Sequence, residues 1–349
     1  MANSNVSTDV MENRMKCETV LTKDYSNMVK GMAVLMMIMH HIWGFPEKIP
    51  ELPLSNLEIQ MGAAGKICVS IFMFLSGYGL YYTFTKKGGI HVWHRVWNVY
   101  KRFWQVFFIF VPIGFLFLSK PFGIGEFLQN LFCLKFSYNH EWWFLGTYIE
   151  LILFLPIVLL VEKKKFFPYL IVVSAIMLRG LSHVVDINSG GGSSHLYNFS
   201  YYYPSFFLGL LFCKYALFEK FRAFMRRESA CVAVCVVLTG LAFVIRKKWD
   251  ITEMTILMTP LFIYLFVAFF RLIGKANKVF LFFGKHSMNM WLIHSFFCYY
   301  YFQKEMLMVS DNAVVDYVLL VAVSMLASMI IDGFRKIVGI VGQKSCMRN

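Results

Sequence analysis

The chain has 349 residues, of which 58% are hydrophobic and only 15% are charged. A soluble domain of this size carries roughly a quarter charged residues, so the composition excludes an ordinary water-soluble enzyme and predicts helices that face lipid. The formal net charge of +14 is divided among short clusters between apolar runs. That pattern is typical of membrane-protein loops and argues against nucleic acid as a partner.

The apolar runs predict the membrane spans. Crossing a bilayer takes roughly 20 apolar residues, fewer where flanking side chains reach the headgroups. The predicted spans are 28–45, 66–84, 100–118, 142–161, 166–184, 201–214, 230–246, 253–272, 279–301 and 314–332. The stretch 121–135 is too polar to span and is expected to form a surface or re-entrant helix. We therefore predict an all-α fold, a polytopic membrane helix bundle of about ten transmembrane helices.

The lysines and arginines predict the orientation of these spans. They concentrate in the N-terminal segment and in every second loop after it, whereas the opposite loops are poor in cations, apart from Arg246, Lys247 and Lys248. Both termini are therefore expected in the cytoplasm. We expect three parts, a polar cytoplasmic N-terminal segment (1–24), a ten-helix membrane domain (25–335) and a short basic cytoplasmic tail (336–349). The expected location is the cell inner or plasma membrane.

The first span, "NMVKGMAVLMMIMHHIWGF", carries one lysine and two adjacent histidines. Ionisable groups inside a membrane are costly, so each is a functional candidate. Lys30 and His41 are eleven residues apart, which brings them within about 20° of one helix face and about 16 Å apart along the axis. His40 lies about 80° from that face and is expected to contact a neighbouring helix. The alternative is that Lys30 extends to the headgroups and His41 is an ordinary hydrogen-bonded bundle histidine.

Further ionisable residues are expected at the depth of His41. Arg179 lies about 20 Å along the fifth span, and His294 lies about 24 Å from the start of the ninth. Glu150 falls near the middle of the fourth span. Polar bridges between helices are the alternative for this group. The eight cysteines include no CxxC pair and are interpreted as small buried thiols, so no metal site is expected.

The second span contains Ser76-Gly77-Tyr78-Gly79. Small residues in a membrane helix favour close helix packing, and the alternative is a thin wall that lets a narrow substrate pass. The chain has no GxSxG elbow, HExxH pair, phosphate-binding Walker loop or dinucleotide-binding glycine pattern.

Several segments in order resemble the acyltransferase-3 family of integral membrane proteins, which O-acylate extracytoplasmic glycans. "VKGMAVLMMIMHH" is similar to the family's first-helix signature of an arginine followed after ten residues by histidine, and "SIFMFLSGYGL" is similar to its F-F-x-x-S-G-F stretch. "EWWFLGTYIELILFLPIV", "FFLGLLF" and "GKHSMNMWLIHSFF" resemble its later segments, and the resemblance covers about 24–332. Lys30 stands here at the position of the family's arginine. A lysine keeps the positive charge, but it cannot bind a phosphate through two parallel hydrogen bonds. No appended extracytoplasmic esterase-like domain is expected.

The resemblance implies transfer of an acyl group, usually acetyl, from cytoplasmic acyl-CoA to a hydroxyl of an extracytoplasmic or cell-surface polysaccharide. Acyl-CoA is then a cosubstrate, and no permanently bound cofactor and no metal are expected. His41 would act as general base or would itself accept the acyl group, which the sequence leaves open. The expected site residues are catalytic His41, Glu150 and His294, acyl-CoA-binding Lys30, Ser76, Lys101 and Arg102, and Arg179 for the oxyanion or the acceptor.

Two other functions are compatible with buried charges in a helix bundle. A transporter or flippase of a glycan precursor would use them as a relay, although such proteins often carry an internal repeat with paired broken helices, which this sequence lacks. A non-catalytic membrane scaffold is the third possibility, and it would need no tunnel from the cytoplasm to His41.

Overall fold

The computed structural model describes the backbone of residues 19–118, 121–189, 195–307 and 309–346. Most of the predicted N-terminal segment and the last three residues of the predicted tail lie outside these residues. Within the described ranges the regular structure is helical, without a strand. The α-helices are α2 (Lys23–Trp43), α3 (Asn56–Gly65), α4 (Ile67–Lys87), α5 (Val92–Phe117), α6 (Ile124–Leu131), α7 (Trp143–Leu159), α8 (Phe167–Ser189), α9 (His195–Tyr215), α10 (Leu217–Met225), α11 (Glu228–Trp249), α12 (Met254–Ile273), α13 (Asn277–Ser295), α14 (Gln303–Leu307) and α15 (Ala313–Cys346).

Each predicted span falls on one of these helices, and the all-α prediction is confirmed for the described residues. Seven segments in this part of the chain are long and apolar enough to cross a membrane. They are Asn56–Lys87, Val92–Phe117, His140–Leu159, Phe167–Val185, Glu228–Trp249, Met254–Ile273 and Ala313–Arg335. The number of ten spans and the cytoplasmic placing of both termini stay predictions.

The helices α2, α9 and α13 match predicted spans but are not among those seven segments. For α2 and α9 the composition explains this, because α2 holds Lys30 and two histidines, and α9 contains the tyrosine run 201–203. These helices also bury much of their surface inside the protein. A helix that faces other helices more than lipid tolerates polar side chains, so the less apolar helices form the interior of the bundle.

Three short helices were not predicted, α3, α10 and α14. α3 begins with a capping box, in which the Ser55 hydroxyl accepts from the Glu58 N–H at 3.4 Å and the Glu58 carboxylate accepts from the Ser55 N–H at 2.7 Å. These two bonds satisfy backbone donors that a helix start leaves free. α3 then leads directly into α4, so the second predicted span is the continuation of a longer helical segment.

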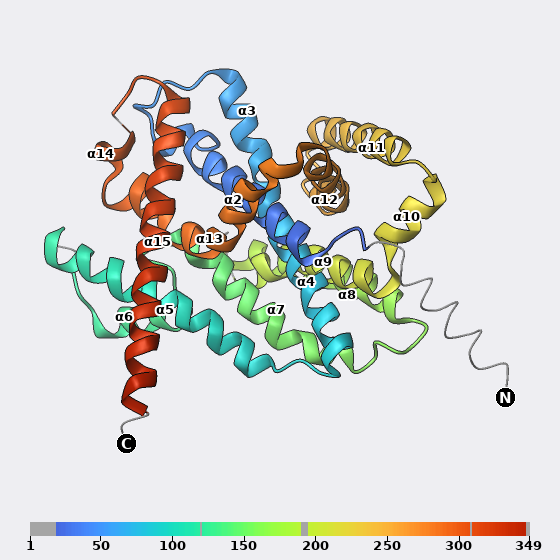
Figure 1. Ribbon diagram of the computed structural model, residues 1–349, viewed down its shortest axis with the longest axis horizontal. Helices are drawn as coiled ribbons and strands as arrows, with labels where there is room; N and C mark the ends of the chain where they lie inside the picture. Colours follow the sequence, from blue (N-terminus) through green and yellow to red (C-terminus); the bar gives the residue numbers. More distant parts are fainter. Residues whose placement is uncertain (1–18, 119–120, 190–194, 308, 347–349) are drawn as a thin grey trace.

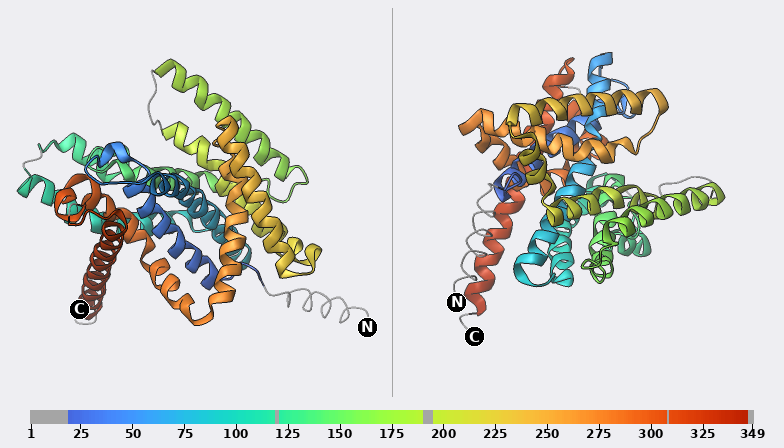
Figure 2. Two further views of the ribbon diagram at one scale, coloured as in Figure 1. Left: turned by 90° about the horizontal axis from the view of Figure 1, so that it is seen from above. Right: turned by 90° about the vertical axis from the view of Figure 1, so that its right-hand side faces the viewer.

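Most of the other helices flank α2 and α4 on two sides (Figure 1). α2 and α4 lie in the middle, with α13, α14 and α15 on one side and α8 to α12 on the other. Figure 2 shows that α11 and α12 run side by side and that α8 lies at the edge of the molecule. α8 and α11 bury few of their residues and expose many large apolar side chains, as expected for helices that face lipid.

The central helices cross at glycines. Gly77 of α4 faces the carbonyl oxygen of Phe206, and Gly209 of α9 faces that of Phe74. α2 and α13 cross in the same way, because Gly284 lies against the backbone of Asn27. A side chain at any of these glycines would overlap backbone atoms of the facing helix. The glycines therefore set the short distance between the helices, as the close-packing interpretation of the Ser76–Gly79 stretch predicts.

We expect Gly209→Leu to destabilise the protein by about 3 kcal/mol, because the new side chain forces α9 away from α4. The measurement is thermal unfolding of the detergent-solubilised chain. Gly240→Leu is the matched control, since a Cβ at Gly240 meets no atom within 4 Å. Equal melting temperatures for the two variants would contradict the close crossing.

Candidate functional site

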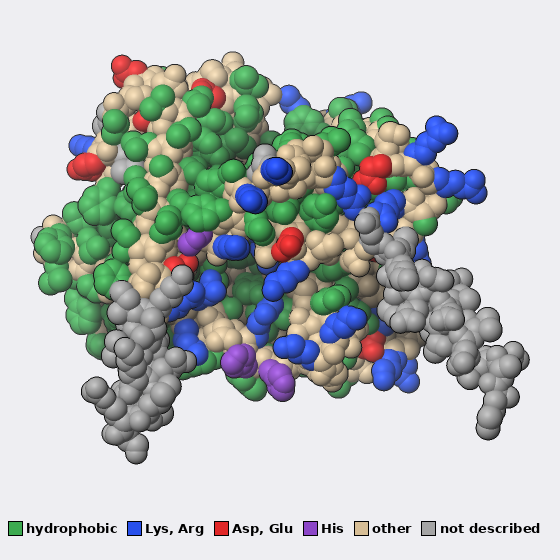
Figure 3. Space-filling model, in the orientation of Figure 1, with side chains coloured by type: hydrophobic (Ala, Val, Ile, Leu, Met, Phe, Trp, Pro, Cys, Tyr) green, Lys and Arg blue, Asp and Glu red, His purple; other side chains and the backbone are tan. Residues whose placement is uncertain are grey.

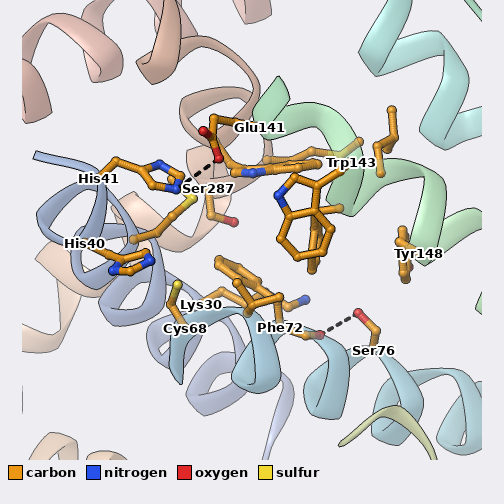
Figure 4. A pocket seen from close by; sticks show the side chains of 16 residues that line it. Lys30, His40, His41, Cys68, Phe72, Ser76, Glu141, Trp143, Tyr148 and Ser287 are labelled. Atoms are coloured by element: carbon orange, nitrogen blue, oxygen red, sulfur yellow. Dashed lines mark hydrogen bonds and ion pairs between the residues drawn. The ribbon is translucent and has the colours of Figure 1, made fainter. Parts of the chain in front are cut away.

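A cavity of about 180 Å³ lies among α2, α4, α7 and α13 (Figure 4). Its walls are mostly apolar and aromatic, with a few polar groups that converge on it. The polar and charged lining residues are Lys30, His40, His41, Ser76, Glu141, Tyr148 and Ser287. A mostly apolar cavity with a few convergent polar groups is the usual form of a small-molecule site.

Lys30 and His41 both line this cavity, so the prediction that they share one face of the first helix is confirmed. Met37, between them on the same stripe, lines it as well. All three belong to the uninterrupted helix α2. The helical rise separates the lysine from the histidine by about 16 Å along the axis.

His41 lies between His294 and Glu141 in a chain of side-chain contacts. The Nδ1 of His41 lies 2.5 Å from the Nε2 of His294, and the two rings are stacked with their centroids 4.7 Å apart. On its other side, the Nε2 of His41 lies 3.3 Å from the Oε2 of Glu141. His294 is completely buried, and His41 and Glu141 are nearly so. The predicted meeting of His41 and His294 is therefore observed.

The hydrogen bonds of this chain fix where the protons lie. The His294 Nδ1 lies 2.8 Å from the carbonyl oxygen of Trp291, which can only accept, so His294 carries its proton on Nδ1. The Nε2 of neutral His294 is then an acceptor, and His41 must donate to it from Nδ1. The Nε2 of His41 is left with a lone pair that faces a carboxylate. His41 and Glu141 are thus arranged to hold one proton between them.

Glu141 is held in place by the short segment that precedes α7. This segment is attached to α13 and the turn after it by three hydrogen bonds, from Asn139 Nδ2 to Ser295 Oγ (2.7 Å), from the His140 N–H to the Tyr300 hydroxyl (2.9 Å), and from Trp142 Nε1 to the Leu292 carbonyl (2.9 Å). The same α13 carries His294. One element therefore positions both partners of His41.

The turn after α13, Phe296–Tyr300, is π-helical. Single π turns inside helices occur often at functional sites. Here the turn brings the Tyr299 hydroxyl to the carbonyl oxygen of His41, to which it donates. The Tyr299 ring also lies 4.6 Å from the Nζ of Lys48, which in turn lies 3.2 Å from the Oε1 of Glu141. Lys48 is the most exposed member of this group, so the chain of charges reaches from His41 toward the surface.

His40 contacts a neighbouring helix, as the helix geometry predicts. Its Nδ1 donates to the carbonyl oxygen of Gly62 in α3 at 2.7 Å, although the ring also borders the cavity. We expect His40→Ala to cost about 1 kcal/mol of stability and to leave more than about a tenth of the activity, because it removes one hydrogen bond between helices. Thermal unfolding and initial rates of the variant check this. A completely inactive, folded His40→Ala protein would contradict the helix-face argument.

The residues expected to bind acyl-CoA are only partly together. Ser76 borders the cavity with Lys30, but its hydroxyl donates to the Phe72 carbonyl at 2.8 Å. Lys101 and Arg102 lie on α5 and do not line the cavity. Lys101 is exposed, with its Nζ 5.7 Å from the centroid of the Trp97 ring. These two cations are therefore candidates for contacts outside the cavity.

Glu150 and Arg179 are not brought to His41. Glu150 lies two turns into α7, on a face toward α9, where its Oε1 is 2.6 Å from the Nδ1 of His195. Arg179 pairs with Glu253 at 3.1 Å, and its guanidinium lies 4.6 Å from the centroid of the Tyr197 ring and 5.0 Å from that of the Tyr201 ring. Neither borders the cavity, so the arrangement does not support the predicted roles of Glu150 in catalysis and of Arg179 at the oxyanion or acceptor.

The sequence interpretation missed Glu141 and Lys48. Glu141 had a visible signal, because it is the only acidic residue next to the aromatic run "WWFLG" at the start of a span. Lys48 had none, since it lies in a loop with other charged residues. The described residues contain no group of three His, Cys, Asp or Glu side chains that could hold a metal ion.

An apolar helix bundle that encloses a cavity with a half-buried lysine, paired histidines and a carboxylate defines a multi-pass membrane protein with an internal polar site. The family model described as an acyltransferase domain, that of the acyltransferase-3 family, matches residues 23–333. The chain therefore belongs to the acyltransferase-3 family and is a membrane acyltransferase. None of the curated proteins and no solved structure shows a significant match to it.

Proposed function

We propose that the protein is an acyl-CoA-dependent O-acyltransferase of the cell inner or plasma membrane, moving an acyl group, in the first place acetyl, to a hydroxyl of an extracytoplasmic or cell-surface polysaccharide. The observation that carries this proposal is the shared cavity, which has Lys30 at one end and the His41–Glu141 pair at the other. A cation suits the phosphates of the donor, and a histidine beside a carboxylate suits proton transfer at its thioester.

The donor fits the cavity by its length and shape. The pantetheine arm of acyl-CoA is long, thin and mostly uncharged, as the aromatic walls require. With its phosphates near Lys30, the arm extends along α2 and presents the thioester carbonyl near His41, about 16 Å away. Donor and acceptor would then approach His41 from opposite sides of the membrane.

In the proposed step, the acceptor hydroxyl gives its proton to the Nε2 of His41 while its oxygen attacks the thioester carbonyl carbon. A C–O bond forms, and the C–S bond breaks when the tetrahedral intermediate collapses. The CoA thiolate released in this way then takes the proton from His41. Glu141, at 3.3 Å, stabilises the imidazolium that exists in between, and His294 holds the ring in the required tautomer.

The arrangement favours His41 as general base over His41 as acyl acceptor. The Nε2 is the only ring nitrogen with a lone pair, and an acyl group bonded there would be pressed against the Glu141 carboxylate. A proton at the same place is instead attracted by that carboxylate. Trapping with labelled acetyl-CoA in the absence of acceptor, followed by mass spectrometry, separates the two routes by the presence or absence of an acyl-histidine.

The proposed function is tested with membrane vesicles that contain the full chain and the host polysaccharide. Acetyl-CoA labelled in its acetyl group is supplied on the cytoplasmic side, and we expect label in the polysaccharide on the other side. Membranes with His41→Gln are the control. Movement of unmodified glycan without any acyl-CoA dependence would favour a transporter or flippase and would overturn the proposal.

A further inference from the structure

The Lys30 end of the cavity lies near a group of cations that the transfer step does not use. We propose that a phosphate-binding patch, made of Lys30, Arg95, Arg102 and Arg335, recognises the nucleotide part of acyl-CoA, with Arg102 and Arg335 binding the ribose 3′-phosphate. This inference rests on the proposed function. It makes the nucleotide a determinant of donor choice, in addition to the thioester arm.

Helix α5 connects the patch. Arg95 and Arg102 are seven residues apart on this helix, which brings them within about 20° of one face and about 10 Å apart. Arg95 lies near enough to Lys30 of α2 for their positive charges to repel each other. Arg102 and Arg335 of α15 repel each other in the same way. Cations from three helices therefore follow one another from the cavity outward.

The far end of the patch is held by a single carboxylate. The Oδ1 of Asp332 lies 3.2 Å from Arg335, and its Oδ2 lies 3.1 Å from the Nδ1 of His286. His286 also contacts the hydroxyl of Ser328 at 3.0 Å, and its neighbour Ser287 borders the cavity. These contacts orient the Arg335 guanidinium from α13 and α15 and connect it to the cavity wall.

The patch has more positive than negative charge. Within the described residues, none of Lys30, Arg95 and Arg102 forms an ion pair with a carboxylate. Asp332 contacts Arg335 and also acts electrostatically on Arg102, so in the described part of the chain one carboxylate serves two guanidinium groups. Like charges gathered in this way are unfavourable unless an anion lies between them. Figure 3 shows lysine and arginine side chains around a hollow in the middle of one face of the molecule.

The spacing suits the nucleotide of CoA. Its diphosphate follows directly after the pantetheine arm and falls near Lys30 and Arg95. The 3′-phosphate lies beyond the ribose, and the patch continues about 10 Å along α5 to Arg102. Guanidinium groups bind phosphate with two parallel hydrogen bonds, which a lysine cannot do. An acyl carrier protein offers the same arm without this nucleotide and should be a poor donor.

The test compares the binding of CoA and 3′-dephospho-CoA by the full chain in lipid nanodiscs, measured by isothermal titration calorimetry. We expect the wild type to bind CoA about tenfold or more tightly than 3′-dephospho-CoA, the usual effect of one charge-assisted contact. Arg335→Gln and Arg102→Gln should each lose most of this preference by weakening the binding of CoA alone. Arg335→Lys should keep part of it, because the charge remains.

Arg271→Gln is the matched control, since Arg271 pairs with Glu228 at 2.9 Å and does not border the cavity. It should bind both compounds as the wild type does. Equal binding of CoA and 3′-dephospho-CoA by the wild type would overturn the phosphate patch while leaving the proposed function intact. An equal loss of CoA and 3′-dephospho-CoA binding in Arg102→Gln and Arg335→Gln would also overturn the phosphate patch and leave the proposed function intact. Binding of neither compound would overturn the proposed function together with the patch.

Discussion

Replacing His41 by glutamine is expected to lower acyl transfer about 1,000-fold, the largest effect of any single substitution in this protein. Glutamine can keep a hydrogen bond toward His294, but it has no lone pair basic enough to take the proton of a hydroxyl. The Nε2 that faces Glu141 at 3.3 Å would be replaced by a group that cannot carry the charge. Binding of CoA should change little, because the phosphates lie about 16 Å away near Lys30.

Initial rates with labelled acetyl-CoA, and CoA binding by calorimetry, measure these two effects separately. The loss should appear in kcat, with the KM for the donor nearly unchanged. Thermal unfolding of the variant shows whether the bundle is intact. Full activity of a folded His41→Gln protein would contradict the proposed mechanism, whichever residue then turned out to provide the base.

Glu141→Gln should reduce kcat about 100-fold, the second-largest effect. The amide has nearly the same shape, so the segment that Asn139, His140 and Trp142 hold against α13 and its following turn remains in place. The negative charge that stabilises the His41 imidazolium is lost. The glutamine NH₂ can in addition donate to the Nε2 of His41 and occupy its lone pair. Lys48, at 3.2 Å from the carboxylate, would lose its partner and leave a net positive charge near the site.

Glu150→Gln is the informative comparison for this experiment. Glu150 also lies in α7 but contacts His195 and does not border the cavity, so its replacement should change kcat by less than about threefold. The measurement is kcat of Glu141→Gln and Glu150→Gln at saturating acetyl-CoA. A loss of the same size in Glu150→Gln would favour the original sequence prediction over the arrangement seen here.

The periodicity of the first helix was sufficient to predict that Lys30 and His41 face the same cavity. Lys30 and His41 share a face because eleven residues make almost three full turns, and this geometry holds wherever the helix lies. The same reasoning separated His41 from His40, which donates to Gly62 instead. Depth counting along the ninth span also brought His294 to the level of His41, where the two rings stack.

The same depth argument failed for Glu150 and Arg179. Depth along a helix gives one coordinate, whereas contact requires that the side chain also face the right neighbour. Glu150 faces α9, and Arg179 faces Glu253 at the start of α12. Glu141 lies before the regular part of α7, in a 3₁₀ turn whose direction depends on hydrogen bonds to residues about 150 positions away. No local pattern encodes that direction.

The sequence by itself determined the membrane class, the helical fold, most of the helix positions and the family, because lipid burial and helical periodicity are properties of each segment alone. The tertiary structure alone decided which carboxylate faces His41, how the protons in the histidine pair are arranged, and how the arginines of α5 and α15 come together. These features depend on the rotation of one helix against another. Such rotations are set by close crossings such as those at Gly77 and Gly209, where backbones far apart in the chain come into contact.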